Sequence, residues 1–421
     1  MSRQMIESGI EWIGEIPFGW KVIPQKYVMH KKKTICEQYN GEDIISLSMQ
    51  GVHVRDLDAG GKMPTTFNGY QYVEPEDLLL CLFDIDVTPR CVGVVHDAGL
   101  TSPAYSRFIV HDGYFNRYYD YLLRFIDDEK ILVHLAKNLR SSLTETDFGM
   151  IKTIIPPLRE QHMIVDYLDQ QCSHIDSVLE QTRTSIEEYK KLKQAVVSQA
   201  VTKGVRGNRA MKDSEVEWLG NIPADWNVYR IANLYDERSE SGLEELPILT
   251  VSINTGVSDH EIADADKDRV FVRSEDRTKY KRVYPGDLAY NMMRAWQGAF
   301  GAVRVDGMVS PAYVVAKPKK NIELDSRYME ALLRTSEATE EMHRYSRGIV
   351  DFRLRLYWPE FKNIHICLPS IEEQIEIADY IDEKVAAIDA LITKKEAFAV
   401  ELEKYKKSMI YEYVTGKKEV L

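Results

Sequence analysis

The sequence predicts an α+β protein in which two similar globular domains are separated by two long helices that pair as an antiparallel coiled coil. Three observations predict this fold. The chain repeats itself with a period of about 210 residues. Each repeat begins with a part rich in Gly, Pro, Tyr and short β-prone runs, and ends with a long stretch that has neither Gly nor Pro. A chain of 421 residues is also too long for one ordinary core.

The duplication is visible as four matches that occur in the same order in both halves. Their offsets drift only slowly along the chain, which chance similarity does not produce. An end marker, Val201-Thr202 and Val414-Thr415, closes each repeat. The four matched pairs are EWIGEIP (11–17, with Trp20) and EWLGNIP (217–223, with Trp226); Val73, Pro75, Asp77, Leu78 and Val283, Pro285, Asp287, Leu288; SPAY at 102–105 and 310–313; and Phe148 to Ile175-Asp176 with Phe361 to Ile388-Asp389.

The first part of each repeat reads as an α+β globule. Short β-prone runs are punctuated by Pro and Gly, and helical stretches interrupt them. The repeat boundaries divide the chain into a globule at 1–157, a long helix at 158–204, a second globule at 205–369 and a second long helix at 370–421. The β-prone runs include Asp77–Phe83, Cys91–Val95, Arg107–Val110 and Val270–Val272, and the helical stretches include Tyr118–Phe125 and Ser326–Arg334.

The second part of each repeat carries an apolar 3–4 spacing that predicts a helix with one buried seam. About forty residues of helix would span roughly 60 Å. A helix with one apolar stripe must bury it, and the duplicate helix is the nearest partner, so we expect the two helices to pair antiparallel with a globule at each end. The alternative is that each seam packs on its own globule or on another subunit. The first seam is Val165, Leu168, Cys172, Ile175, Leu179, Thr182, Ile186 and Tyr189. The second is Ala378, Ile381, Val385, Ile388 and Ile392, then Ala399, Leu402 and Met409, with Lys395 and Lys406 interrupting it.

Composition limits the class of protein. The formal net charge is −12, and none of the four parts is basic overall, so a DNA-binding face can only be a minority of the surface. The five cysteines are scattered and form no CxxC, which favours reduced thiols in a cytoplasmic protein. The sequence contains no apolar run long enough to cross a membrane, and its first residues do not resemble a signal peptide.

The sequence shows no catalytic constellation. It has no P-loop, no Gly-rich turn that would cradle S-adenosylmethionine, and no Asn-Pro-Pro-aromatic motif for methylation of an amino group on a base. The ten histidines have no metal-ligand spacing, so no metal site is expected. Asp84 and Asp86 could suggest a nuclease carboxylate pair, but solvated loop charges are the preferred interpretation.

Basic and aromatic residues mix in several places, most densely at 267–282. Arg can read guanine with two hydrogen bonds and Gln can read adenine, whereas Lys mostly contacts phosphate. The alternative for each residue is an ordinary solvated position. The candidate DNA-binding residues are Arg55, Arg90, Arg107, Arg140, Arg273, Arg277, Lys279, Lys281, Arg282, Arg294, Trp296, Gln297, Arg347 and Arg353. The SPAY repeats, by contrast, are expected to be structural turns that enter a strand.

The duplicated plan and its motifs resemble the specificity (S) subunits of type I restriction-modification systems. The similarity covers essentially the whole chain. Its most specific parts are IIPPLREQHMIVDYLDQQCSHID and ICLPSIEEQIEIADYIDEKVAAID, each of which leads into a long helix. The entry motifs EWIGEIPFGW and EWLGNIPADW, and the segments TSPAYSRF and VSPAYVVA, add to it.

The resemblance implies two target-recognition domains that each read one half of a split double-stranded DNA sequence. The helices would act as a spacer and as the docking surface for two methyltransferase (M) subunits. No cofactor is expected in this chain: S-adenosylmethionine would be held by the M subunits, and ATP and Mg by the restriction (R) subunits. The first globule departs from the second, since Asp86–Pro89 stands where the other has Arg294–Gln297. An asymmetric target is therefore expected. The alternative function is a coiled-coil scaffold that does not bind DNA.

Overall fold

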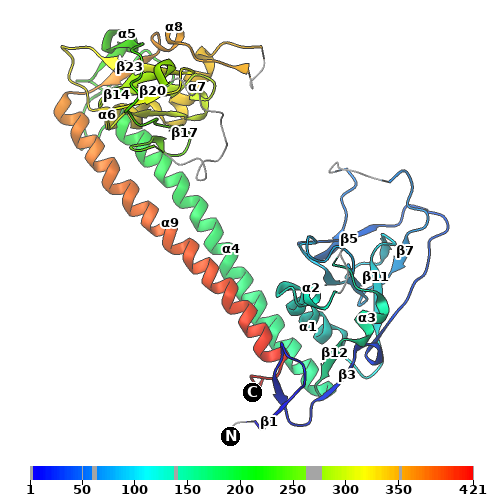
Figure 1. The fold of residues 1–421 in the computed structure, drawn as a ribbon. Helices are drawn as coiled ribbons and strands as arrows, with labels where there is room; N and C mark the ends of the chain where they lie inside the picture. The colour runs from blue at the N-terminus through cyan, green and yellow to red at the C-terminus, as the bar shows by residue number, and fades with distance from the viewer. Residues whose placement is uncertain are drawn as a thin grey trace. The chain divides into compact units, whose positions relative to one another are not determined.

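The computed structural model describes residues 3–49, 51–58, 64–136, 141–261, 277–349 and 353–420. The chain forms two compact units. Unit 1 comprises Met1–Arg183 and Ala397–Leu421, and unit 2 comprises Thr184–Glu396. Each unit contains one mixed globule of helices and strands together with a segment of each long helix (Figure 1).

The globule of unit 1 is built on two four-stranded sheets, β6-β5-β10-β7 and β4-β11-β8-β9. The two-stranded pairs β1-β2 and β12-β3 flank them, and the helices α1 and α2 follow β11. Its elements are β1 (Met5–Glu7), β2 (Glu15–Pro17), β3 (Lys21–Pro24), η1 (Gln25–Tyr27), β4 (Met29–Lys31), β5 (Ile44–Ser48), β6 (Gly51–Val54), β7 (Gln71–Val73), β8 (Leu78–Leu80), β9 (Val92–Val94), β10 (Gly99–Thr101), β11 (Ser106–Val110), α1 (Asn116–Asp128), α2 (Ile131–Leu135), α3 (Glu145–Met150) and β12 (Lys152–Ile155).

The globule of unit 2 repeats the central sheet as β16-β23-β20-β21 and surrounds it with four two-stranded pairs. Its elements are β13 (Met211–Asp213), β14 (Asn221–Pro223), β15 (Asn227–Arg230), α5 (Ile231–Leu234), β16 (Tyr235–Arg238), β17 (Val251–Ser252), β18 (Gly256–Val257), η3 (Arg277–Lys279), β19 (Lys281–Val283), β20 (Leu288–Asn291), η4 (Ala295–Gln297), β21 (Phe300–Ala302), β22 (Gly307–Val309), β23 (Tyr313–Pro318), α6 (Ser326–Leu333), α7 (Ser336–Tyr345), α8 (Trp358–Phe361) and β24 (His365–Leu368).

The shared central sheet explains the uninterrupted apolar runs in the sequence. Side chains alternate between the two faces of a strand, so a strand that is covered on both faces has no polar position. Leu78 and Leu80 of β8 lie in the main core of unit 1, whereas Leu79 points into a second core with Ile45 and Val52. The duplication and the α+β character predicted from the sequence are both confirmed.

The two long helices are α4 (Leu158–Lys203) and α9 (Ile371–Val414). Neither contains Gly or Pro, so nothing interrupts their backbone hydrogen bonds. Both end shortly before a glycine in the left-handed region, Gly204 with φ 76° and Gly416 with φ 71°, where other residues are strained. The stretch 370–421 therefore contains α9 and a short tail that is not helical.

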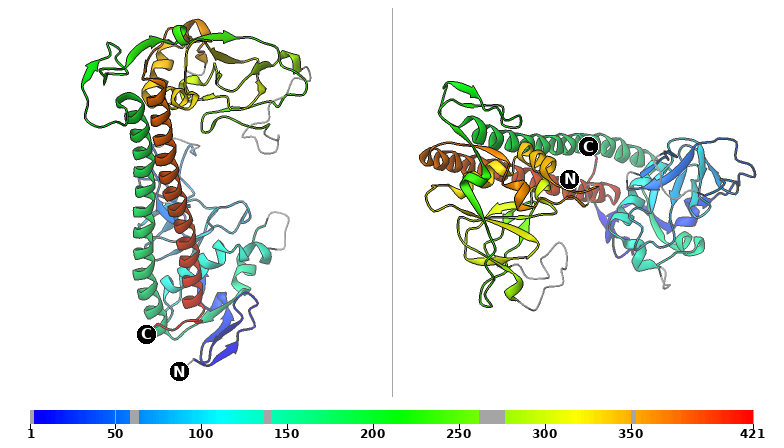
Figure 2. Two further views of the ribbon diagram at one scale, coloured as in Figure 1. Left: turned by 90° about the vertical axis from the view of Figure 1, so that its left-hand side faces the viewer. Right: turned by 90° about the horizontal axis from the view of Figure 1, so that it is seen from above.

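In unit 1 the first half of α4 pairs with the last part of α9. The ring centroids of Tyr167 and Tyr413 lie 4.4 Å apart, and the Lys406 Nζ atom lies 2.6 Å from Asp176 Oδ1. Sequence position rises along α4 while it falls along α9, so the pairing is antiparallel, and the two helices lie side by side in both orientations of the molecule (Figure 2). Lys406, which interrupts the predicted seam, is accommodated by this ion pair.

In unit 2 the remaining segments of the two helices also pair antiparallel. Ile186 packs with Ile388 and Ile392, and the Lys193 Nζ atom lies 2.7 Å from Asp389 Oδ2. Lys395, the other charged residue in the seam, lies 5.7 Å from the ring centroid of Tyr189 as a cation–π contact. The predicted antiparallel pairing of the two seams is confirmed within each unit.

The repeated Trp and Glu-Gln motifs meet where a globule joins the start of a long helix. In unit 1 the Trp20 indole N–H donates to Glu160 Oε2 at 3.0 Å, and the Arg3 guanidinium lies 5.5 Å from the Trp20 ring centroid. The next residue, Gln161, donates to the Pro156 carbonyl at 2.8 Å and accepts the backbone N–H of Phe115 at 2.8 Å. The Glu-Gln pair therefore locks the first turn of α4 onto the globule.

Unit 2 repeats this junction with Trp226, Glu373, Arg209 and Gln374. The indole donates to Glu373 at 3.1 Å, and the guanidinium lies 2.6 Å from the same carboxylate. Each junction also receives the end of the other long helix. The Tyr118 hydroxyl donates to the Val414 carbonyl at 2.6 Å, and the Tyr328 hydroxyl donates to the Val201 carbonyl at 3.2 Å.

Candidate nucleic-acid interface

A short turn in unit 2 displays two of the candidate DNA-binding residues. It connects β20 to β21 through η4, and Gly298, with φ 91°, allows the chain to reverse there. Trp296 is half-buried: its indole N–H donates to the Met293 carbonyl at 3.2 Å, and its ring lies 5.2 Å from His343 of α7. Trp296 therefore anchors the turn, while Gln297 is exposed and Arg294 is partly exposed beside it.

A second cationic segment lies next to this turn. Arg347 and Arg355 exchange two backbone hydrogen bonds of 2.9 Å each, and the Leu356 N–H donates to the Met292 carbonyl at 2.8 Å. The Arg347 guanidinium is 2.7 Å from Glu360, yet its side chain is 75% exposed. Arg353 is exposed on the same segment. The fold thus brings Arg294, Gln297, Arg347 and Arg353, which are far apart in the sequence, to one region of unit 2.

The basic residues of β19 are more committed to the protein than the sequence suggests. Lys281 donates from Nζ to the Tyr313 carbonyl at 2.8 Å. Arg282 lies 4.6 Å from the ring centroid of Tyr284, and Arg238 lies 4.5 Å from the same ring. Lys281 and Arg282 are both partly buried and already contact other groups of the protein, so less of each side chain is available to contact DNA.

Tyr313 connects β19 to the Arg294 turn. Burial raises the pKa of the Tyr313 hydroxyl, while a hydrogen bond with the Val251 backbone and the positive charge of Arg294 act against this rise. Tyr313 closes the second SPAY turn, in which its N–H donates to the Ser310 carbonyl at 2.9 Å. Tyr105 does the same to Ser102 at 3.1 Å in unit 1, so both SPAY motifs are turns that enter a strand, as expected.

Part of the predicted basic segment and one other candidate cannot be placed. Arg140 and Arg273 lie outside the residues that the structure describes, as do most of 267–282 and the β-prone run Val270–Val272. Arg277 begins η3, and its side chain is also outside the description. Lys279 ends the same helix and is exposed.

In unit 1, Arg107 is a core residue. Its side chain is 1% exposed, its Nε atom lies 2.6 Å from Asp77 Oδ2, and its Nη1 donates to the Tyr72 carbonyl at 2.9 Å. Burial raises the pKa of Asp77, and the Arg107 guanidinium opposes that rise. In this conformation the guanidinium stabilises the turn before β8 and does not reach the surface.

In unit 2 the equivalent buried carboxylate is paired with an arginine from a different strand. Asp287, the counterpart of Asp77, pairs at 2.8 Å with Arg238 of β16. Arg238 is registered opposite Val315, and Val315 is the counterpart of Arg107. The buried carboxylate is therefore paired with one arginine in each globule, but that arginine lies on β11 in unit 1 and on β16 in unit 2. The sequence repeat carried a signal for this exchange, because an arginine at one position is matched by a valine at the other.

The two remaining candidate arginines that the structure describes in unit 1, Arg55 and Arg90, are partly exposed. Arg55 follows β6, and its charge lowers the pKa of Tyr105, which burial raises more strongly. Since Tyr105 is the counterpart of Tyr313, each of these tyrosines has the charge of one arginine, Arg55 or Arg294, acting against the rise of its pKa. The Arg90 guanidinium is 3.9 Å from Asp128.

The hydrogen-bond pattern fixes which residues of the two globules correspond. Leu143 N–H donates to the Leu82 carbonyl at 2.8 Å, as Leu356 does to Met292. Arg294 follows Met292 by two residues, as Asp84 follows Leu82, and the next residues, Ile85 and Ala295, are both fully buried. Asp84–Val87 therefore corresponds to Arg294–Gln297, which corrects the pairing with Asp86–Pro89 taken from sequence offsets.

Within the ranges that the structure describes, His, Cys, Asp and Glu form no group of three or more that could hold a metal ion. Of the helices in those same ranges, none is long and apolar enough to cross a membrane. The five cysteines are all buried free thiols.

Two α+β globules built on the same central four-stranded sheet, each joined to the start of one long helix and the end of the other, define a duplicated two-domain protein. No family model matches the chain. Curated relatives do carry the name that the sequence motifs suggested. The type I restriction enzyme MjaVIII specificity subunit of Methanocaldococcus jannaschii is 27% identical over 288 residues, which cover 64% of this chain and 63% of that protein.

Two further relatives carry equivalent names. The putative type I restriction enzyme MjaX specificity subunit of the same organism is 33% identical over 115 residues, 27% of this chain and 25% of that protein. The type I restriction enzyme EcoBI specificity subunit of Escherichia coli is 23% identical, covering 93% of this chain and 84% of that protein. The matches to the two Methanocaldococcus proteins thus span less than two thirds of their lengths.

Solved structures share the fold. A chain from a study of complex assembly and conformational transition of the type I R-M system superposes with a TM-score of 0.67 at 13% identity, covering 96% of this chain and 99% of that one. The HsdS subunit from Thermoanaerobacter tengcongensis gives a TM-score of 0.53 at 15% identity, covering 96% and 98%. The resemblance to type I specificity subunits and the predicted fold class are thereby confirmed.

Proposed function

We propose that this chain is the DNA-reading specificity subunit of a type I restriction-modification complex. It reads a split, asymmetric target in double-stranded DNA and directs the methyltransferase and restriction subunits to it. It carries no catalytic site of its own and works in the cytoplasm. The observation that carries the proposal is the duplication of one globule at two helix junctions, with different side chains at the equivalent surface position.

That equivalent position supports two readers with different preferences. In unit 2 it carries Arg294 and Gln297, whose side chains suit guanine and adenine edges in the major groove. In unit 1 the corresponding residues are Asp84 and Val87, which cannot make those contacts. Two globules with the same backbone and different contact residues would read different bases, so the target is expected to be asymmetric.

The charge distribution supports a reader that works inside a complex. The chain has a net charge of −12, and neither globule carries more Lys and Arg than Asp and Glu. Affinity for any DNA sequence grows with the number of phosphates that are neutralised, so the isolated chain would bind nonspecific DNA weakly. Linking two weak readers raises their joint affinity through effective concentration.

The partners follow from the same proposal. Two M subunits would dock on the long helices and hold S-adenosylmethionine, and R subunits would hold ATP and Mg. The motif residues of the junctions support this indirectly, because Trp20 with Glu160 and Trp226 with Glu373 fix each globule to a helix. A partner that docks on the helices would then set the position of the attached globule.

The test is methylation mapping of genomic DNA from cells that carry this chain with its M subunit. The expected result is adenine methylation at one split motif with two unlike halves, absent when either chain is omitted. Methylation that does not depend on this chain would overturn the proposal. A complex that assembles and shows no sequence preference would favour the scaffold alternative.

A further inference from the structure

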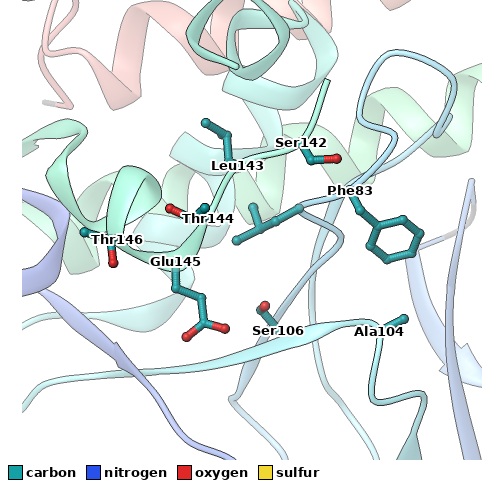
Figure 3. Close-up of a pocket in the computed structure, with 9 residues that line it drawn as sticks. Phe83, Ala104, Ser106, Ser142, Leu143, Thr144, Glu145 and Thr146 are labelled. Carbon is teal, nitrogen blue, oxygen red and sulfur yellow. The ribbon is translucent and has the colours of Figure 1, made fainter. Parts of the chain in front are cut away.

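A shallow, open cavity of about 460 Å³ lies on the surface of unit 1 beside the loop that follows β8. The turn before β11 and the segment 142–146 form its other walls. Figure 3 shows the Glu145 carboxylate directed toward Ser106, with the Phe83 ring on the opposite side. Phe83 is 39% exposed, which is unusual for an aromatic ring next to a core. The cavity is large enough to receive the edge of a base and its neighbour.

The lining selects for hydrogen-bond donors. It contains one carboxylate, that of Glu145, and the hydroxyl groups of serine and threonine residues at 106, 142, 144 and 146. None of the described residues that line it carries a positive charge, so a phosphate group has nothing to neutralise it there. An ionised carboxylate only accepts hydrogen bonds, and its best neutral partner is therefore an amino group.

The carboxylate is partly compensated from outside the cavity. Lys31 of β4 forms an ion pair with Glu145, and the two side chains are 28% and 49% exposed. A neighbouring cation reduces the repulsion between the carboxylate and the phosphates of an approaching duplex. Glu145 can thus lie close to DNA without excluding it, while its oxygen atoms stay accessible.

The position of the cavity supports a role in reading. Its wall residues Leu82 and Leu143 are joined by the same hydrogen bond that joins Met292 and Leu356 beside the Arg294 turn. In unit 2 the positions of Thr144 and Glu145 carry Tyr357, which is 44% exposed, and Trp358, which is half-buried and whose ring centroid lies 6.1 Å from that of Phe361. The equivalent positions therefore carry a hydroxyl group and a carboxylate in unit 1, and two aromatic side chains in unit 2.

We propose that this cavity is the base-reading site of unit 1 and that it takes the exocyclic amino group of a base, cytosine N4 foremost, in the major groove. Glu145 accepts the amino hydrogen, and Phe83 makes apolar contact with the adjacent base. Carboxylate side chains accept from cytosine N4 in this way. The inference rests on the proposed function and adds the chemical identity of one base in the half-site of unit 1.

The first experiment changes the acceptor. The full chain with Glu145→Gln is assembled with its M subunit, and the methylated sites are mapped. An amide can donate as well as accept, so selection for an amino base should relax roughly tenfold at one position of one half-site. The other half-site should stay unchanged. Glu129→Gln, which alters an exposed carboxylate elsewhere in unit 1, is the matched control and should leave both halves intact.

The second experiment keeps the protein unchanged and alters the DNA. Each cytosine of the affected half-site, and each adenine other than the one that is methylated, is replaced by an analogue without its amino group, and methylation by the wild-type complex is measured. One position should lose roughly tenfold in rate, and the Glu145→Gln complex should be indifferent at that position. The measurement on the wild-type complex does not depend on how well the variant folds.

The outcomes separate the two proposals. A wild-type complex without a split motif would overturn the proposed function itself. A wild-type complex with a split motif, in which no amino-group deletion in the half-site of unit 1 matters, would overturn the cavity proposal and leave the function standing. Unchanged base preference in Glu145→Gln would do the same.

Discussion

The arginine exchange between the two globules gives a prediction that separates a structural arginine from a DNA contact. Arg107→Val copies the residue that unit 2 has at this place, Val315. It removes the partner of Asp77, whose side chain is 7% exposed and lies 2.6 Å from the guanidinium. Breaking a buried ion pair by removing one partner costs about 3–5 kcal/mol. The contact with Glu74, whose side chain is 66% exposed, should add little.

The stability of unit 1 is measured by hydrogen exchange at the amides of Leu78–Leu80, which report on the sheet next to the lost pair. Arg90→Val is the matched control. The Arg90 guanidinium lies 3.9 Å from the carboxylate of Asp128, whose side chain is 35% exposed, so the expected loss of stability is below about 1 kcal/mol. Lys32→Arg in the Arg107→Val background should recover part of the loss. Lys32 is hydrogen-bonded through its N–H to the Arg107 carbonyl, and it corresponds to Arg238 of unit 2.

The pH dependence supplies an independent check. Burial already raises the pKa of Asp77, and loss of Arg107 removes the charge that opposes this rise. A carboxyl group whose pKa is higher in the folded state binds more protons there, so it destabilises the fold as pH rises. Arg107→Val should therefore regain stability as pH falls from 7 toward 4, more than the wild-type protein does. If the variant unfolds no more readily than the wild type yet binds DNA more weakly, Arg107 is a DNA contact and the structural assignment is wrong.

Three further predictions concern function. Replacing 1–157 with the globule of a relative should change one half of the methylated motif only, and a change in both halves would contradict two independent readers. The double variant Arg294→Ala, Arg353→Ala should lower the DNA affinity of the assembled complex. The slope of log affinity against log salt concentration should become shallower by about one to two, because fewer counterions are released on binding. An unchanged slope would show that these two residues do not contact DNA phosphates. Inserting one heptad into both long helices, near Thr182 and near Lys395, adds about 10 Å of helix, so the unread DNA spacer should grow by roughly three base pairs while both halves stay the same. An active variant that keeps the original spacer would show that the helices do not measure the DNA.

Local pattern was enough for the main features of the fold. The absence of Gly and Pro, together with a 3–4 apolar spacing, predicted α4 and α9, because helix formation depends on neighbours three and four residues away. The repeat predicted two equal globules, because similar sequences bury similar cores. The pairing of the seams followed as well, since each apolar stripe needs a partner and the duplicate offers one of matching length.

The candidate site shows where sequence reasoning stopped. Arg107 and Arg294 look alike in the sequence, yet one is 1% exposed in an ion pair and the other lies on a surface turn. The difference comes from Asp77, which is distant in the chain and lies 2.6 Å away in the fold. Phe83 and Glu145 were not singled out, because the cavity they line exists only where the loop after β8, the start of β11 and the segment 142–146 meet.

The sequence alone determined the duplication, the two helices and the family resemblance, because each of these depends on spacing along the chain. Only the tertiary structure decided which charged side chains are buried in ion pairs that stabilise the fold and which are exposed and available for binding. Burial and pairing of a charged group depend on partners that are far away in the sequence, such as Glu373, whose carboxylate serves both Trp226 and Arg209. No period in the sequence encodes those partners, since they are brought together only by packing.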